Sequence, residues 1–147
     1  MAAVTILAVG RLKRGPETEL VSRYQTRLKR LKTSLREFPE RQSKSREGVD
    51  LLAALPGNSF VIALDEHGDD MASAEFASLL GDRLDQGQVL SFIIGGSDGL
   101  ADEVRQRADR VIRFGRLTWP HQLVRGLLME QIYRAETILL GHPYHRV

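Results

Sequence analysis

Residues 89–100, VLSFIIGGSDGL, decide the fold class of this chain. The run 89–94 is continuously apolar, which is typical of a strand buried on both faces of a sheet. The glycine-rich stretch 95–99 follows it directly, and residues 101–108 have the pattern of a short helix. A strand, a glycine-rich turn and a helix start in this order bring backbone N–H groups close to a nucleotide-like ligand. A structural turn that needs glycine for its backbone conformation is the alternative interpretation.

The same alternation extends outward to both ends of the chain. Pro16 begins a helix in which Leu20, Tyr24, Leu28 and Leu31 recur at helical spacing. Polar residues 39–48 predict a mobile loop, and Gly141 is placed to stop the last helix. We expect the other strands at residues 4–10, 35–38, 59–64 and 110–114, an acidic turn at 65–70, and the other helices at 49–55, 73–84 (Ser73 as cap) and 121–140. The pattern predicts a single α/β domain over residues 1–147, with about five strands covered on both faces.

Length and composition exclude several classes of protein. The chain has 147 residues and no cysteine, so it has room for one core and lacks disulfides and thiolate nucleophiles. No apolar stretch reaches the roughly 18 residues that span a bilayer. Basic residues follow the apolar N-terminus instead of preceding it, which argues against a secretory signal. We expect a cytoplasmic protein without a membrane partner.

The net charge of +2 conceals an uneven distribution. Residues 1–50 carry 12 Lys and Arg against 6 Asp and Glu, whereas residues 51–110 carry 4 against 11. Residues 111–147 are basic again, with 5 against 2. Such asymmetry indicates a polyanionic partner, although a solvated basic helix near the N-terminus would give the same pattern.

The last third of the chain concentrates residues that carry chemistry. It holds His121, the only tryptophan, Trp119, and the tail 142–146, HPYHR. Imidazole, phenol and guanidinium groups together suit phosphate contact, base stacking and proton transfer, although terminal residues often fray. His121, His142 and His145 could in principle bind a metal, but the tail has no carboxylate, so we expect no metal.

The carboxylates give weaker signals. Asp65 and Glu66 follow a strand and are the best candidates for buried carboxylates, although a solvated turn is the preferred interpretation for Glu66, Asp69 and Asp70. Glu130 and Glu136 fit surface ion pairs on the last helix.

Several reaction classes lack their motifs. The turn is neither G-x-G-x-x-G nor a phosphate-binding loop, because no Lys and Ser/Thr follow the glycines, and this argues against a phosphotransferase. No arrangement of Ser, His and Asp that would form a nucleophile stands out, which disfavours covalent catalysis.

Five stretches together resemble a known family. They are VTILAVGRLK at the start, Leu64-Asp65, IIGGSDGL, FGRLTWPHQLVRGLLMEQIYRA and the closing HPYHR. In this order and at this spacing they resemble ribosomal RNA large-subunit methyltransferase H, of the SPOUT superfamily. The resemblance runs essentially end to end. It implies a Rossmann-like parallel-sheet domain with a C-terminal trefoil knot, a homodimer, and methylation of N3 of a pseudouridine in 23S rRNA on assembled ribosomes.

The resemblance also implies a site for S-adenosylmethionine. The matching positions for cofactor binding are Leu64, Gly95, Gly96, Phe114, Gly115, Arg116, Leu117, Thr118 and Trp119. For catalysis, His121 and His145 are candidate bases, Arg125 and Arg146 candidate groups for an N3 anion or phosphate, and Tyr144 a candidate to orient the base. A non-catalytic ribosome-binding factor is the alternative function.

Overall fold

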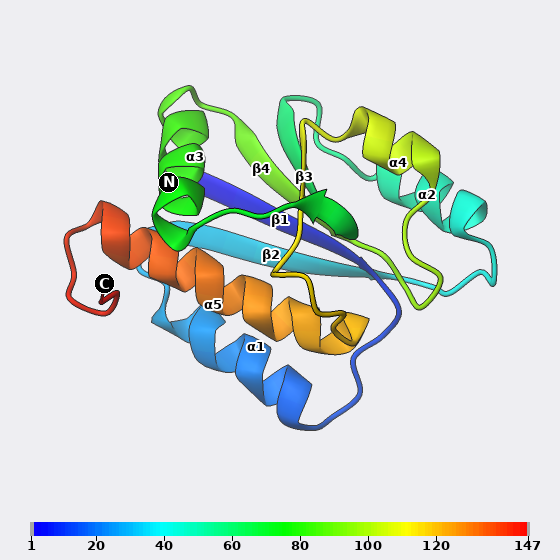
Figure 1. Cartoon of the computed structure of the whole chain (residues 1–147), viewed down its shortest axis with the longest axis horizontal. Helices are drawn as coiled ribbons and strands as arrows, with labels where there is room; N and C mark the ends of the chain where they lie inside the picture. The colour runs from blue at the N-terminus through cyan, green and yellow to red at the C-terminus, as the bar shows by residue number, and fades with distance from the viewer. Residues whose placement is uncertain (1, 147) are drawn as a thin grey trace.

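The chain forms a five-stranded sheet in which every pair of neighbouring strands is parallel (Figure 1). The computed structural model describes residues 2–146. The strand order is β2-β1-β4-β3-β5. The strands are β1 (Ala2–Val9), β2 (Leu31–Phe38), β3 (Ser59–Asp69), β4 (Val89–Ile94) and β5 (Arg110–Ile112). The predicted α/β class and parallel sheet are confirmed.

Helices cover both faces of the sheet. One face carries α1 (Pro16–Arg27), α3 (Ser73–Asp85) and α5 (His121–Leu139), and the other carries α2 (Lys44–Ala53) and α4 (Asp102–Arg107) (Figure 1). In β4, Phe92 packs in the core beneath the first group and Ile93 in the core beneath the second. Both side chains are fully buried, which explains why this strand is an uninterrupted apolar run. Within residues 2–146, no helix combines the length and the apolar character needed to cross a membrane.

The junction between α1 and β2 lies earlier than the leucine spacing predicts. Helix α1 ends at Arg27, Leu28 is already extended, and Leu31 begins an eight-residue strand. The buried carboxylate of Glu136 accepts the backbone N–H groups of Lys29, Arg30 and Leu31. These contacts replace the hydrogen bonds that a continued helix would make, so Leu28 and Leu31 lie outside it.

Three further local predictions are wrong. Helix α2 begins at Lys44 within the predicted loop, because the Ser43 hydroxyl accepts the N–H of Arg46 and caps it. Strand β3 continues through the predicted acidic turn to Asp69, which pairs with Ile112 of β5. Helix α3 begins at Ser73, whose hydroxyl donates to Gln131 instead of capping the helix.

Candidate functional site

A cavity of about 400 Å³ lies beside the carboxyl ends of β3 and β4. Three segments wall it: the end of β3 from Leu64 to His67, the glycine turn from Ile94 to Leu100, and the connection between β5 and α5. Val124 of α5 and Lys44 of α2 also line it. Ligands of open α/β sheets bind at this edge, where the strands end and the loops diverge.

Two glycines of the turn have little space for a side chain. A Cβ on Gly95 would lie 2.7 Å from the carbonyl oxygen of Gly99, and one on Gly96 would lie 3.0 Å from Val9. Gly96 and Gly99 pair across the turn, where the Gly99 N–H donates to the Gly96 carbonyl at 3.0 Å. Gly95 and Gly96 therefore let the backbone itself form one wall of the cavity.

The connection from β5 to α5 forms the opposite wall. Phe114, Gly115, Leu117, Thr118 and Trp119 line the cavity. The indole N–H of Trp119 donates to the Phe114 carbonyl at 2.9 Å, which closes the segment into a loop. Arg116 is exposed, and its side chain is absent from the lining. The cavity thus gathers eight of the nine residues expected to bind the cofactor, the exception being Arg116.

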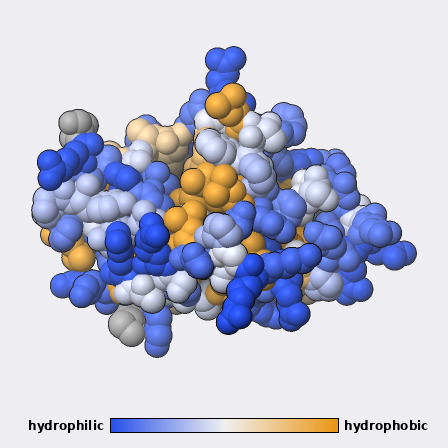
Figure 2. All heavy atoms as spheres, turned by 90° about the horizontal axis from the view of Figure 1, so that it is seen from below, coloured by the Kyte–Doolittle hydropathy of each residue, from blue (hydrophilic) through white to orange (hydrophobic). Residues whose placement is uncertain are grey.

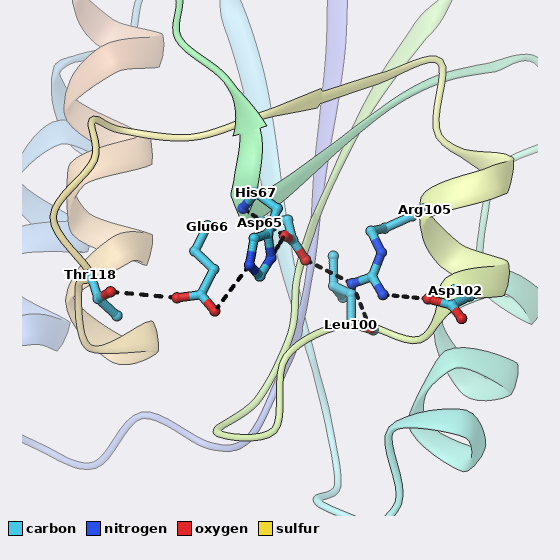
Figure 3. Close-up of polar contacts among 7 residues, drawn as sticks. All are labelled: Asp65, Glu66, His67, Leu100, Asp102, Arg105 and Thr118. Atoms are coloured by element: carbon cyan, nitrogen blue, oxygen red, sulfur yellow. Dashed lines mark hydrogen bonds and ion pairs between the residues drawn. The ribbon is translucent and has the colours of Figure 1, made fainter.

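An ion pair joins two of the walls (Figure 3). The Asp65 carboxylate accepts a hydrogen bond from Arg105 at 2.9 Å, and the same guanidinium nitrogen donates to the Leu100 carbonyl at 2.8 Å. The side chain of Asp65 is 6% exposed. Burial by itself raises the pKa of Asp65, but the His67 N–H and Arg105 outweigh it and hold that pKa below 3.8. Asp65, the expected buried carboxylate, fixes the end of β3 to the glycine turn.

A weaker contact reaches the third wall. The exposed carboxylate of Glu66 lies 3.4 Å from the Thr118 hydroxyl and 3.9 Å from a nitrogen of His67 (Figure 3). The imidazole of His67 also lies 3.2 Å from Asp65 and is largely exposed. A chain of polar side chains therefore crosses one side of the cavity from Arg105 to Thr118.

Among the expected catalytic residues, His121 alone lines the cavity. It begins α5, and its Nε2 is buried without a hydrogen-bond partner in residues 2–146. A buried imidazole nitrogen that lacks a partner is costly unless a ligand or water supplies one. His121 is therefore the one expected catalytic residue beside the cavity, and its Nε2 is enclosed by protein atoms without a partner among residues 2–146.

Arg125 lies outside the cavity, where its side chain holds elements of the fold together. Its side chain is 1% exposed and donates to the carbonyls of Val9 and Gly10 at 2.9 and 2.7 Å and to Glu37 at 2.7 Å. These contacts tie the end of β1 to α5. Both terminal nitrogens are engaged and Nε is buried without a partner in residues 2–146, so within this chain the guanidinium does not reach a phosphate or an anionic base.

The C-terminal tail lies far from the cavity of its own chain. The Tyr144 hydroxyl donates to Glu130 at 3.0 Å, and the His145 imidazole lies 3.1 Å from Arg134. Arg146 is exposed. Glu130 and Arg134 lie about 14 and 20 Å along α5 from His121, at 1.5 Å per residue. The structure thus separates Tyr144, His145 and Arg146 from His121.

Two of the charged residues at the cavity could not be recognised from the sequence. Arg105 is in a short helix of ordinary composition, and Lys44 is in a segment expected to be a loop. Across residues 2–146 there is no cluster of three or more His, Cys, Asp or Glu that could hold a metal ion.

Comparison with known proteins identifies the family. Residues 2–145 match the family model described as "Predicted SPOUT methyltransferase". The chain belongs to this family. It is 51% identical to ribosomal RNA large subunit methyltransferase H of Paramagnetospirillum magneticum, over 96% of this chain and 97% of that protein. It is 47% identical to the protein of the same name from Allorhizobium ampelinum, over 97% of this chain and 98% of that one. The predicted family is confirmed.

Two solved structures share the fold. A putative methylase family protein from Neisseria gonorrhoeae aligns with a TM-score of 0.54 at 10% identity, over 99% of this chain and 85% of that one. The SpoU methyltransferase AviRb from Streptomyces viridochromogenes, in complex with AdoMet, aligns with a TM-score of 0.50 at 14% identity. That match covers 90% of this chain and 57% of AviRb. The fold of this SPOUT protein is thus shared with methyltransferases of very different sequence.

Proposed function

We propose that this SPOUT protein transfers a methyl group from S-adenosylmethionine to N3 of a pseudouridine in 23S rRNA. The observation that carries the proposal is the cavity itself, because the segments that match the family's cofactor motifs converge on it. Relatives up to 51% identical bear the name ribosomal RNA large subunit methyltransferase H, which supports rRNA as the substrate. Pseudouridine N3 and the assembled ribosome come from the family resemblance and remain predictions.

The cavity fits S-adenosylmethionine in size and chemistry. Its volume of about 400 Å³ lies in the range of sites for small molecules and cofactors. Ile94, Leu100, Phe114 and Val124 supply apolar surface, and the glycine turn brings backbone close to a ligand. Leu64, Gly95 and Gly96 would hold the cofactor on one side, and residues 114–119 on the other.

The reaction requires few chemical steps from the protein. The sulfonium of S-adenosylmethionine supplies an already activated methyl group, so the protein has to align donor and acceptor and remove one proton. The N3–H of a pseudouridine is weakly acidic and loses its proton when the methyl group is added. His67 and His121 both line the cavity, and of the two we assign the base to His121, whose Nε2 has no hydrogen-bond partner within residues 2–146. A cation near N3 would stabilise the developing anion.

We infer that this cation comes from the tail of a second copy of the chain. The tail packs along α5, well away from the cavity of its own chain. In a two-fold dimer with α5 packed antiparallel to its counterpart, the tail of one protomer would lie near the partner's cavity. Tyr144, His145 and Arg146 could then act together with His121.

Exposed apolar surface supports this homodimer. Leu117 is 78% exposed and Trp119 is 41% exposed beside the cavity, and Leu139 and Leu140 at the end of α5 are each 46% exposed. Apolar side chains also gather in the middle of the face seen from below, the side on which α1 and α5 lie (Figure 2). Large exposed apolar patches mark interaction sites. The trefoil knot remains a prediction, as does the location in the cytoplasm, where ribosomes are.

Transfer of label from S-adenosylmethionine to rRNA tests the function. Purified protein and labelled cofactor are incubated with assembled ribosomes or with free 23S rRNA, and the modified nucleotide is identified by mass spectrometry. We expect one labelled pseudouridine per ribosome and little label on free rRNA. Ribosome binding without label would support the non-catalytic factor instead.

Mixing two inactive variants tests the shared site. His121→Ala removes the candidate base in the cavity, and His145→Ala removes an imidazole of the tail. If each site combines one cavity with the partner's tail, a mixed dimer has one intact site, and an equal mixture recovers about one quarter of the wild-type activity. No recovery after subunit exchange, or a monomer in sedimentation, would contradict the shared site.

A further inference from the structure

The junction between α1 and β2 carries a second basic surface, which we name the basic turn: Arg27, Lys29, Arg30 and Lys32. All four residues are exposed. Within residues 2–146 none of them forms an ion pair with a carboxylate. By contrast, Arg41, Arg105, Arg107, Arg113, Arg125 and Arg134 are each paired. The basic turn therefore presents four uncompensated cations within six residues.

A buried carboxylate holds the backbone of the basic turn in place. Glu136 is 3% exposed and accepts the N–H groups of Lys29, Arg30 and Leu31 at 2.7 to 3.2 Å. Its carboxylate oxygens are thus engaged by backbone N–H groups, and within residues 2–146 the carboxylate forms no ion pair with a side chain. A backbone anchored in this way loses less conformational entropy when a partner binds.

Aromatic side chains connect the basic turn to the C-terminal tail. The Arg27 guanidinium lies 5.5 Å from the ring centre of Tyr24 and 6.0 Å from that of Tyr133. Tyr133 in turn packs edge-on against Tyr144 at 4.7 Å. The basic turn and the tail are therefore parts of one surface, in which cations alternate with aromatic rings.

We propose that the basic turn binds phosphate groups of the RNA on either side of the target nucleotide. This inference rests on the proposed function, because it assigns the RNA contact to a surface continuous with the catalytic tail. Lys and Arg side chains provide most of the affinity for an RNA backbone, and neighbouring aromatic rings stack on unpaired bases. Cations without a carboxylate partner and half-buried rings on a fixed backbone suit this ligand. An acidic protein surface of the ribosome would need no aromatic rings.

Neutralising two cations of the basic turn tests the proposal. The variant Arg30→Gln/Lys32→Gln is compared with Arg46→Gln/Arg110→Gln. The control removes two exposed cations that form no ion pair within residues 2–146, from α2 on the other face of the sheet and from β5 at the opposite edge. Binding to large ribosomal subunits and to protein-free 23S rRNA is measured over a range of salt concentrations. For Arg30→Gln/Lys32→Gln we expect roughly tenfold weaker binding to both, and a salt dependence shallower by about 1.5 in log K per log salt. The control variant should bind like the wild type.

Cofactor titration and label transfer separate this inference from the proposed function. Both variants should bind S-adenosylmethionine like the wild type, because neither change touches the cavity. Equal salt dependence of binding in the two variants would overturn the role of the basic turn. So would a loss of affinity seen only with whole subunits and not with protein-free rRNA, because it would indicate a ribosomal protein as the partner. Wild-type protein that binds RNA but transfers no label would refute the proposed function and leave the binding comparison intact.

Discussion

The two ends of α5 adjoin two differently built regions. At its start, the cavity is walled by backbone turns, two tight glycines and short apolar segments. At its other end, side chains from α1, α5 and the tail hold one another through hydrogen bonds and aromatic contacts. The first region is a site shaped by local sequence, and the second is a surface shaped by contacts between distant segments.

This difference predicts how the two regions respond to substitution. Changes at the cavity should weaken ligand binding, and they should lower stability only where the changed residue is itself buried, as Gly95 is. Changes at the far end of α5 should lower stability and leave cofactor binding intact. Each variant below therefore needs two measurements, the affinity for S-adenosylmethionine and the free energy of unfolding.

Gly95→Ala should have the largest effect. Its Cβ would lie 2.7 and 2.8 Å from backbone atoms of Gly99, so the turn must open. Overpacking of this kind costs about 1–3 kcal/mol of stability. Because the opened turn displaces a wall of the cavity, we also expect a loss of at least about tenfold in affinity for S-adenosylmethionine in calorimetric titration, which corresponds to about 1.4 kcal/mol. Gly57→Ala is the matched control, because nothing lies within 4 Å of its Cβ. Equal affinities in the two variants would contradict the role of the turn.

The sequence predicted the parts of the fold that rest on local patterns. Apolar runs gave the strands β1, β3 and β4, and helical spacing gave α3 and α5. The start of β2 was missed because its signal is tertiary, a buried Glu136 more than a hundred residues away along the chain. The acidic C-terminal residues of β3 were missed because charged residues at the end of a strand are typical of a turn.

At the candidate site too, the sequence predicted the features that depend on local motifs and missed those that depend on tertiary contacts. Motif resemblance found the cavity walls, because glycines and strand ends are visible in sequence. Spacing could not show that Arg125 faces two backbone carbonyls, nor that Glu136 is buried instead of on the surface. Tertiary packing decides which of several possible partners a charged side chain contacts, and a single sequence does not show the outcome.

Glu136→Gln tests the region at the far end of α5. A neutral amide is a weaker acceptor for three backbone N–H groups, and its own NH₂ cannot accept any of them. We expect the free energy of unfolding in urea to fall by about 2 kcal/mol. Cofactor affinity should not change. The exposed Glu103→Gln in α4 is the control. A loss of cofactor affinity as large as that of Gly95→Ala would mean that the two regions are not independent.

Asp65→Asn should have the smallest effect and tests whether the ion pair couples the cavity walls. Asn keeps the shape but loses the charge that binds Arg105, while the Arg105 contact with Leu100 can persist. We expect a loss of about 1 kcal/mol in stability and a severalfold loss in cofactor affinity. Asp102→Asn is the control, because Asp102 binds the same guanidinium but is 79% exposed. Equal effects of the two variants would argue against a coupling role for Asp65.

The pH dependence of stability gives a sharper test of the same ion pair. The pKa of Asp65 lies below 3.8 in the folded protein, because the His67 N–H and Arg105 outweigh the effect of burial. The charged carboxylate therefore stabilises the fold fully above the ordinary pKa, and this contribution is lost as the pH falls through the lowered value. In urea unfolding, the wild type should exceed Asp65→Asn in stability at pH 6, and the difference should shrink toward pH 3. A difference that stays constant over this range would show that packing, and not charge, holds the end of β3 to the glycine turn.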